Sequence, residues 1–384
     1  MTTTALTLKR RHLLLSAASL GLSTLAPAPA WSQISKPSKP QRNPAVVQIV
    51  DTSIAQRDVS RDFLIGSRAA WQDINARGGI RSRAIEHITI ETDGSIASLR
   101  SAIGTVRGLP HCVALSGTAG DRAATQLVSL LHQEQLEIAH VAPWLLNSEL
   151  DGDERTFPIF APREKQIAHA LKSLSVMGVP ELGAIYASAQ EHEMYRPEVE
   201  RTAAKLKIRL QSYGPTNNLK GIGQSLTPET PAILLFLGGT PELVQFTQGI
   251  AKQARQRYVI ALADVNLQTL MQMGAARNTS VMATQVVPMV TSSLPVVRHY
   301  RETLSRLFDE APTPLSLAGF IAARYTHEVL STIDGAPTRK NVLQAFQQRN
   351  SVDIGGFRVS FNAQRRSGAF VTQSMLGADG RVIG

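Results

Sequence analysis

The sequence predicts an α/β protein made of two doubly wound parallel-sheet lobes joined by hinge crossings. The chain has 384 residues, more than one hydrophobic core usually organises. From residue 45 onward, short β-rich runs alternate with segments of helical period, which is typical of βαβ units around a parallel sheet. A polar, acidic stretch at 146–155 interrupts this alternation, which then resumes, so we expect two lobes.

Residues 1–44 are predicted to lie outside this fold. The basic residues 9–11 precede an apolar run that ends in alternating alanine and proline, as in a cleavable signal peptide. We therefore expect residues 1–30 to be a signal peptide for the Sec or twin-arginine route, and a periplasmic location. Proline and serine are frequent in residues 31–44, which predicts a flexible leader.

The first half of the chain is predicted to form α/β units of one lobe. The run AVVQIV at 45–50 indicates a buried strand. Apolar residues at helical spacing follow it, and Gly78 and Gly79 mark the end of that helix. The alternation continues, with predicted strands at 45–50, 84–91, 111–115 and 137–142.

The second half repeats the pattern. Pro197 and Pro241 are expected in the first turns of helices, where the missing backbone N–H is not needed. The predicted strands lie at 156–160, 182–187, 208–212, 232–237, 257–263 and 280–287.

The end of the chain is predicted to cross between the lobes. After residue 294 the pattern is helical, and the alternating segments 355–361 and 367–376 predict a closing antiparallel hairpin. We expect lobe 1 to comprise residues 45–159 and 289–354, and lobe 2 to comprise residues 160–288 and 355–384.

Composition narrows the classes of partner. The formal net charge is +10, but the basic residues are scattered among acidic neighbours and aromatic residues make up only 5%. This pattern favours a solvated surface, and we expect no nucleic-acid partner. Cys112 is the only cysteine and lies in an apolar run, so a buried structural thiol is expected. Nothing in the sequence indicates a metal or a cofactor.

The loop LSGTAGDRAATQ at 115–126 is the strongest candidate for ligand contact. Small residues follow a strand and lead into a helix, where backbone N–H groups and the helix dipole favour an anion. Motifs for phosphate loops and serine hydrolases are missing, GIGQSL at 221–226 lacks the third glycine of a dinucleotide loop, and His192 has no second histidine for a zinc helix. We therefore expect the protein to be no enzyme, and the loop to hold an anion.

Two segments carry a family resemblance. D-I-N-A-R-G-G-I at 73–80, with the strand before it, and Q-V-V-P at 285–288 resemble the leucine/isoleucine/valine-binding type of periplasmic binding protein. The resemblance extends over residues 45–384 and implies the type I fold of that family. It implies a monomeric receptor of an ABC importer that closes on a small amino acid or related organic acid and presents it to a membrane permease.

The resemblance also implies a ligand site in the first lobe. In the family, a small-residue loop binds the ligand α-carboxylate through backbone N–H groups and a hydroxyl. Asp121, at the same helix start, would repel that carboxylate if it pointed inward. Thr118 has the alternative role of a turn or cap residue. The loop residues assigned to the site are Ser116, Gly117, Thr118, Ala119 and Gly120.

The second lobe is expected to supply further contacts. Asp264 is predicted to face the ligand amine or to cap the helix that follows it. Arg163 is a candidate clamp that would favour an acidic ligand, or a solvated helix residue, and Tyr186 is a ligand contact or a core residue. The predicted site also includes Ser53, Gln56 and Gly239.

Two other functions remain open from the sequence. A sensory module of the same fold would signal to a kinase or chemoreceptor instead of a permease. An exported α/β enzyme would need a titratable pair in the cleft, for which Asp264 with His192 or Glu193 are the candidates.

Overall fold

The structure, a computed structural model, describes residues 42–150, 152–215, 218–275, 279–361, 367–368, 370–377 and 382–383. The predicted signal peptide at 1–30, and the leader up to residue 41, lie outside the described residues. Among the described residues, no helix combines the length and the apolar character needed to cross a membrane.

The first lobe is built on a parallel sheet with the strand order β2-β1-β3-β4-β5. Its central strand β1 is buried at every position, which explains its uninterrupted apolar sequence. The strands are β1 (Ala45–Asp51), β2 (Glu86–Thr92), β3 (Cys112–Ser116), β4 (Ala139–Val141) and β5 (Thr156–Phe157).

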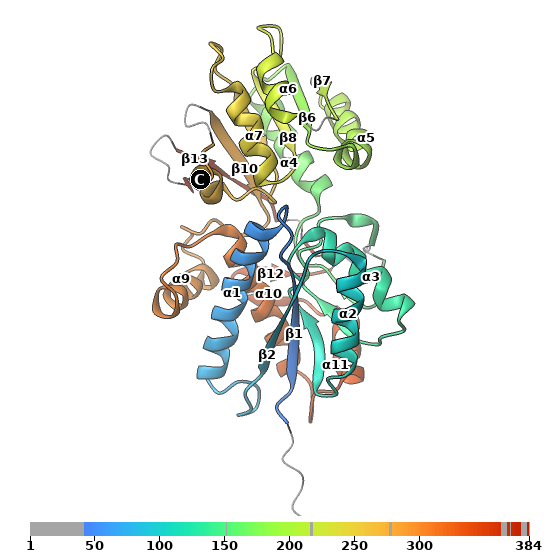
Figure 1. Ribbon diagram of the computed structural model, residues 1–384. Helices are drawn as coiled ribbons and strands as arrows, with labels where there is room; N and C mark the ends of the chain where they lie inside the picture. Colours follow the sequence, from blue (N-terminus) through green and yellow to red (C-terminus); the bar gives the residue numbers. More distant parts are fainter. Residues whose placement is uncertain are drawn as a thin grey trace, which may run out of the picture. The chain divides into compact units, whose positions relative to one another are not determined.

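Helices cover both faces of this sheet. Val46 and Val50 of β1 share a core cluster with α1 (Arg57–Ala76) and α10 (Pro314–Ser331). Val47 of the same strand points to the other face, into a cluster with α2 (Ile96–Arg107) and α3 (Asp121–Gln133). Figure 1 shows α1 on one side of β1 and α2 and α3 on the other. The first lobe is therefore doubly wound, as predicted.

The second lobe has a larger, mostly parallel sheet of order β14-β13-β10-β9-β8-β6-β7. Strands β10, β9, β8, β6 and β7 are parallel to one another, whereas β13 pairs antiparallel with both β10 and β14. Its strands are β6 (Glu181–Tyr186), β7 (Arg209–Tyr213), β8 (Ile233–Leu237), β9 (Tyr258–Ala261), β10 (Ser280–Gln285), β13 (Thr372–Leu376) and β14 (Val382–Ile383).

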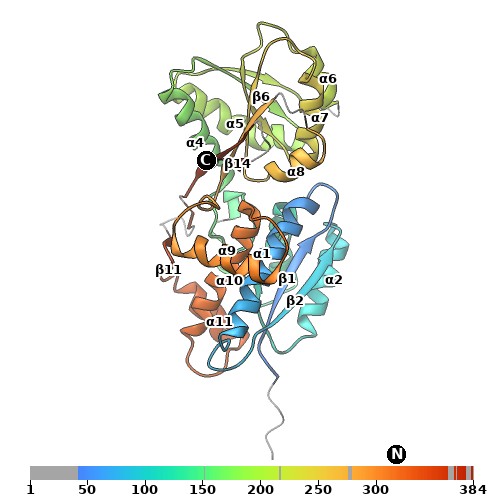
Figure 2. The ribbon, with the colours of Figure 1, turned by 90° about the vertical axis from the view of Figure 1, so that its left-hand side faces the viewer.

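Helices again lie on both faces of this sheet. Two helices, α4 (Arg163–Val176) and α5 (Ala189–Lys205), pack on one face, and α6 (Leu219–Ser225), α7 (Thr240–Ile250) and α8 (Leu267–Gln272) pack on the other. Figure 2 shows α4 and α5 on one side of β6 and α6 and α7 on the other. The α/β class with two doubly wound lobes is confirmed.

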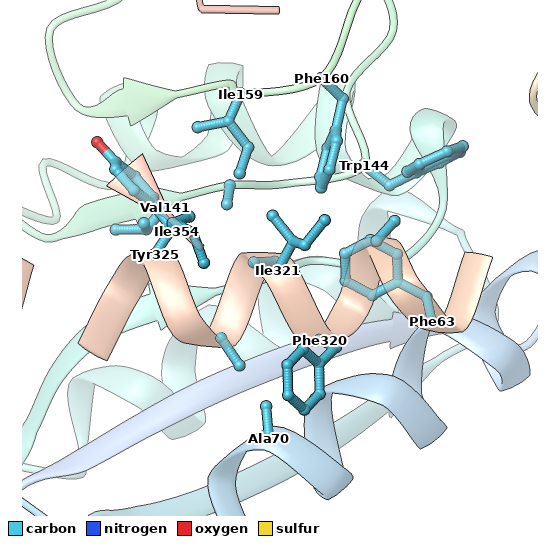
Figure 3. Packing of buried hydrophobic residues seen from close by; sticks show 14 of the residues in the cluster. Phe63, Ala70, Val141, Trp144, Ile159, Phe160, Phe320, Ile321, Tyr325 and Ile354 are labelled. Carbon is cyan, nitrogen blue, oxygen red and sulfur yellow. The ribbon is translucent and has the colours of Figure 1, made fainter. Parts of the chain in front are cut away.

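The close contact of α10 with α1 sits at the centre of the first lobe's core. A Cβ built on Gly66 of α1 would lie 1.6 Å from the backbone oxygen of Ser316, so only glycine permits this approach. In Figure 3, Phe320 of α10 points toward Ala70 of α1, and Ile321 points toward Phe160. This packing holds α10 against β1 and α1, and the loop between β1 and α1 leads to the ligand cavity.

The remaining elements of the first lobe follow β10. They are α9 (Pro295–Leu307), α11 (Arg339–Gln347) and the short strands β11 (Val352–Ile354) and β12 (Phe357–Val359); a 3-10 turn, Ser148–Leu150, precedes β5.

The predicted closing hairpin is wrong. Strand β12 pairs antiparallel with β11, and β13 pairs with β10 and β14. Phe357 and Val359 of β12 join the core cluster that contains α1 and α10. Alternation identified these strands, but it carries no information about their partners. We propose that the last crossing between the lobes follows β12 rather than residue 354.

Pro197 is also placed differently from the prediction. Helix α5 begins at Ala189, where the Ser188 side chain accepts a hydrogen bond from the Glu191 N–H, and it continues through Pro197. Pro241, in contrast, lies in the first turn of α7 as expected. A serine cap nine residues upstream of Pro197 therefore sets the start of α5.

Candidate ligand-binding site

Arg163, the first residue of α4, lies between carboxylates of the two lobes. Its Nε donates to Asp264 Oδ2 over 3.0 Å, and its Nη2 donates to the same oxygen. Its Nη1 donates to Asp121 Oδ2 and to the Tyr195 hydroxyl, both over 2.6 Å. The Tyr195 ring also faces the guanidinium at 5.2 Å. We name Arg163, Asp121 and Asp264 the Arg163 clasp.

The two carboxylates of the clasp have further donors. Asp121 Oδ1 accepts from the Leu146 N–H over 2.6 Å, and Asp264 Oδ1 accepts from Trp144 Nε1 over 3.1 Å. Burial alone would lower the pKa of Arg163, but the charges of Asp121 and Asp264 outweigh it and hold that pKa above its ordinary value. One guanidinium thus faces two carboxylates, and the clasp carries a net negative charge.

A cavity of about 490 Å³ lies beside the clasp. Ser53 and Gln56, from the loop between β1 and α1, line it together with the first turn of α3. From the second lobe it is lined by Arg163 and by the first turns of α5 and α7. These segments follow the carboxyl ends of parallel strands, which is where α/β sheets bind ligands.

The wall of the cavity is acidic. It includes the carboxylates Asp121, Glu191 and Glu242 and the guanidinium groups of Arg122 and Arg163. Burial raises the pKa of the Glu191 carboxyl, and the charges of Glu242 and Asp264 raise it further against the opposite effect of Arg163. Glu191 is therefore close enough to Glu242 and Asp264 for their charges to repel.

Three buried acceptor atoms of the cavity residues have no hydrogen-bond partner among the described residues. They are Gln56 Oε1, Gln126 Oε1 and Glu242 Oε2. Buried acceptors without a donor are costly. Each of these oxygen atoms is closed to solvent, so other atoms of these side chains form the surface of the cavity.

Several polar groups of the loop predicted to hold a carboxylate are committed within the first lobe. The N–H groups of Gly117 and Ala119 donate to Val141 O and Ile49 O over 2.8 and 2.9 Å. The Ser116 hydroxyl pairs with Thr326, and the Thr118 hydroxyl pairs with His140 Nε2 over 2.9 Å.

These loop residues lie behind the cavity rather than in its wall. Ser116, Thr118 and Ala119 are buried, and the residues that line the cavity do not include any of the loop from Ser116 to Gly120. Gly117 and Gly120 both have positive φ, and a Cβ on Gly120 would lie 2.8 Å from the Cβ of Asp51. We therefore leave this loop out of the site proposed below.

The other predicted residues divide into two groups. Ser53, Gln56, Arg163 and Gly239 line the cavity. Asp264 lies behind Arg163 as its ion-pair partner, and Asn266 takes the cap position of α8. Tyr186 is fully buried, with its ring against His192 at 4.9 Å between centroids, and burial raises its pKa to about 12.

Sequence reasoning missed Glu191, Glu242 and the pairing of Asp121. Asp121 does line the cavity, but Arg163 and the Leu146 N–H hold its carboxylate. A signal for these residues was present, since each is acidic and lies in the first turn of a helix that follows a strand. Among the described residues, no three His, Cys, Asp or Glu side chains are grouped so as to hold a metal ion.

The chain belongs to the periplasmic binding protein family, whose model matches residues 46–377. This membership confirms the resemblance carried by residues 73–80 and 285–288. No curated protein matches the chain in sequence.

Solved structures show the same fold. A substrate-binding periplasmic protein from Ralstonia solanacearum is 21% identical with a TM-score of 0.79, over 89% of this chain and 99% of that one. An extracellular ligand-binding receptor from Verminephrobacter eiseniae is 18% identical with a TM-score of 0.81, over 89% and 100%. The branched-chain amino acid transporter substrate binding protein LivJ from Streptococcus pneumoniae, in complex with isoleucine, is 12% identical with a TM-score of 0.77, over 89% and 98%.

Proposed function

We propose that the protein is an exported receptor that captures a small polar solute in the cavity beside the Arg163 clasp and presents it to the permease of an ABC importer. The observation that carries this proposal is the cavity of about 490 Å³, whose wall combines residues of both lobes. A solute that contacts both lobes binds the closed form better than the open form and so shifts the equilibrium toward closure. The family membership and the structure of LivJ support the transport role.

Solute binding is tested by thermal unfolding of the mature protein in the presence of small-molecule panels. A solute at 100 times its Kd adds about 2.7 kcal/mol to the free energy of unfolding and raises the melting temperature. In Thr125→Trp, an indole on α3 would enter the cavity and abolish the shift. The matched control is Thr105→Trp on the exposed face of α2, which should keep it. A shift that survives Thr125→Trp would contradict this location of the site.

The transport role is tested by reconstituting the protein with a permease and its ATPase in vesicles. Transport predicts solute uptake that depends on the receptor and delivers the solute chemically unchanged. Receptor-dependent stimulation of a sensor kinase without uptake would favour the sensory alternative. Consumption of the solute by the purified protein, lost in Asp264→Ala, would favour the enzyme alternative.

Export is tested by determining the N-terminal residue of the protein isolated from cells. We infer that residues 1–30 direct the chain across the inner membrane and are removed. The protein isolated from the periplasm should then begin at residue 31, and Arg10→Lys with Arg11→Lys should block export only if the twin-arginine route is used. Recovery of the intact N-terminus from the cytoplasm would contradict this inference.

A further inference from the structure

The anion-binding capacity of the helix ends at this cavity is already used by the protein itself. Helices α3, α4, α5 and α7 begin beside it, and each N-terminus attracts negative charge. Each of these helices carries its own carboxylate in the first turn: Asp121, Glu164, Glu191 and Glu242. A bound anion would have to compete with these side chains.

The single buried cation of the wall is also occupied. Arg163 is shared between Asp121 at 2.6 Å and Asp264, and the clasp keeps one excess negative charge. Arg122, the other basic residue of the wall, is exposed to solvent. The predicted preference for an acidic ligand rested on Arg163, and in this geometry its guanidinium is committed to these two carboxylates.

Two carboxylates of the wall form no ion pair within the part of the chain that the structure describes, although the charge of Arg163 acts on one of them, Glu191. Among the described residues, neither Glu191 nor Glu242 takes part in an ion pair shorter than 4.0 Å. The Ser188 hydroxyl donates to Glu191 Oε2, and Glu242 Oε2 is buried with no donor among the described residues. Gln56 and Gln126 add neutral polar side chains to the same wall.

We propose that the cavity takes a small organic cation with several N–H donors, of the ammonium or guanidinium class, rather than a carboxylate. Its charge offsets that of Glu191 and Glu242, and its N–H groups donate to carboxylate oxygens of these two residues. This inference rests on the proposed function, because it names the class of solute bound at the same site.

The test uses the mature protein and titration calorimetry with four probes. Putrescine and agmatine represent the cationic class, glutarate represents anions, and isoleucine represents zwitterions. Putrescine or agmatine should bind, glutarate should not, and isoleucine should bind more weakly than the cations. Affinity for the cation should fall as the salt concentration rises, because the attraction is partly screened.

Two variants test which carboxylates bind the cation. Glu242→Gln and Glu191→Gln should each weaken binding of the cation about 10- to 100-fold, as expected for the loss of one charge-assisted hydrogen bond. The control is Glu198→Gln, which removes a carboxylate of α5 that pairs with Arg201 and Thr202 and does not line the cavity. It should leave the affinity unchanged.

The outcomes separate this inference from the proposed function. If glutarate or isoleucine binds best, and Thr125→Trp abolishes that binding, the receptor function stands and the cationic class is overturned. If Glu242→Gln and Glu191→Gln leave cation binding unchanged, the cationic class is overturned as well. If no solute of any class binds, or binding is indifferent to Thr125→Trp, both proposals fall.

Discussion

Replacing Arg163 by methionine should destabilise the protein strongly, because it removes the one cation between two poorly exposed carboxylates. The side chains of Arg163, Asp121 and Asp264 are 12%, 14% and 8% exposed. Removing one partner of a buried ion pair costs about 3–5 kcal/mol, because the remaining charge is left without compensation. Asp121 keeps the Leu146 N–H and Asp264 keeps Trp144 Nε1, so we expect the lower end, about 3 kcal/mol.

A second substitution separates charge from packing. In Arg163→Met with Asp121→Asn, one of the two uncompensated charges is gone, and the double variant should regain about 1 kcal/mol or more over Arg163→Met. The control is Arg196→Met. Its guanidinium lies 3.7 Å from Glu200 with both side chains about half exposed, and its loss should cost less than about 0.5 kcal/mol.

Urea unfolding without solute measures these differences. Far-ultraviolet circular dichroism and tryptophan fluorescence should report the same transition, and linear extrapolation gives the free energy of unfolding in water. An Arg163→Met protein within 0.5 kcal/mol of the wild type, or a double variant less stable than Arg163→Met, would show that the clasp is not a stabilising charge pair.

Three further predictions follow from the same structure. Thr118→Ala removes the hydrogen bond to His140 and should lower the free energy of unfolding by about 1–3 kcal/mol while leaving the solute Kd unchanged. A tenfold weaker Kd in calorimetry would show that this loop belongs to the binding site. Burial lowers the pKa of His140 to about 4, below its ordinary 6.5, so the unfolded state takes up a proton first as the pH falls. Stability should therefore decrease from pH 6.5 toward 4. Between pH 7 and 5, the free energy of unfolding from urea titrations should fall by about 2 kcal/mol more for the wild type than for His140→Gln. Parallel pH profiles of the two proteins would contradict this. Gly66→Val should lower the free energy of unfolding by at least about 3 kcal/mol or prevent folding, because the new Cβ meets Ser316 O. The control, Gly104→Val on α2, has open space around it and should change stability by less than about 1 kcal/mol. Equal shifts of the melting temperature for the two variants would refute the close packing of α1 on α10.

The architecture was predictable because its signals are local. A strand buried on both faces leaves an unbroken apolar run, as in β1, and an amphipathic helix leaves a periodic one. Ser53, Gln56, Arg163 and Gly239 were found for a related reason, since they lie close after strands at one edge of their sheets. The place of a residue relative to the end of a strand can be predicted from the sequence.

The roles of the polar side chains were less predictable because they depend on distant partners. The hydroxyl of Ser116 meets Thr326, 210 positions away, and Arg163 meets Asp264, 101 positions away. Nothing near 116–120 in the sequence shows that its donors are already used. The same limit affected the closing hairpin, because β12 and β13 have correct alternation and different partners.

The acidic wall also bears on how closure is coupled to the solute. Arg163 bonds to Asp121 of the other lobe, and Asn266 Nδ2 donates to Asp62 Oδ2 over 2.8 Å, so bringing the lobes together forms favourable bonds without any solute. A receptor with only such bonds would close empty, because a solute shifts the equilibrium only through what it adds to the closed form. Glu191 and Glu242 of the second lobe share the cavity wall with Asp121 of the first, so lobe closure gathers like charges, which repel, around one space. A solute of the proposed cationic class would lie between these carboxylates and remove that repulsion. Closure then depends on the solute.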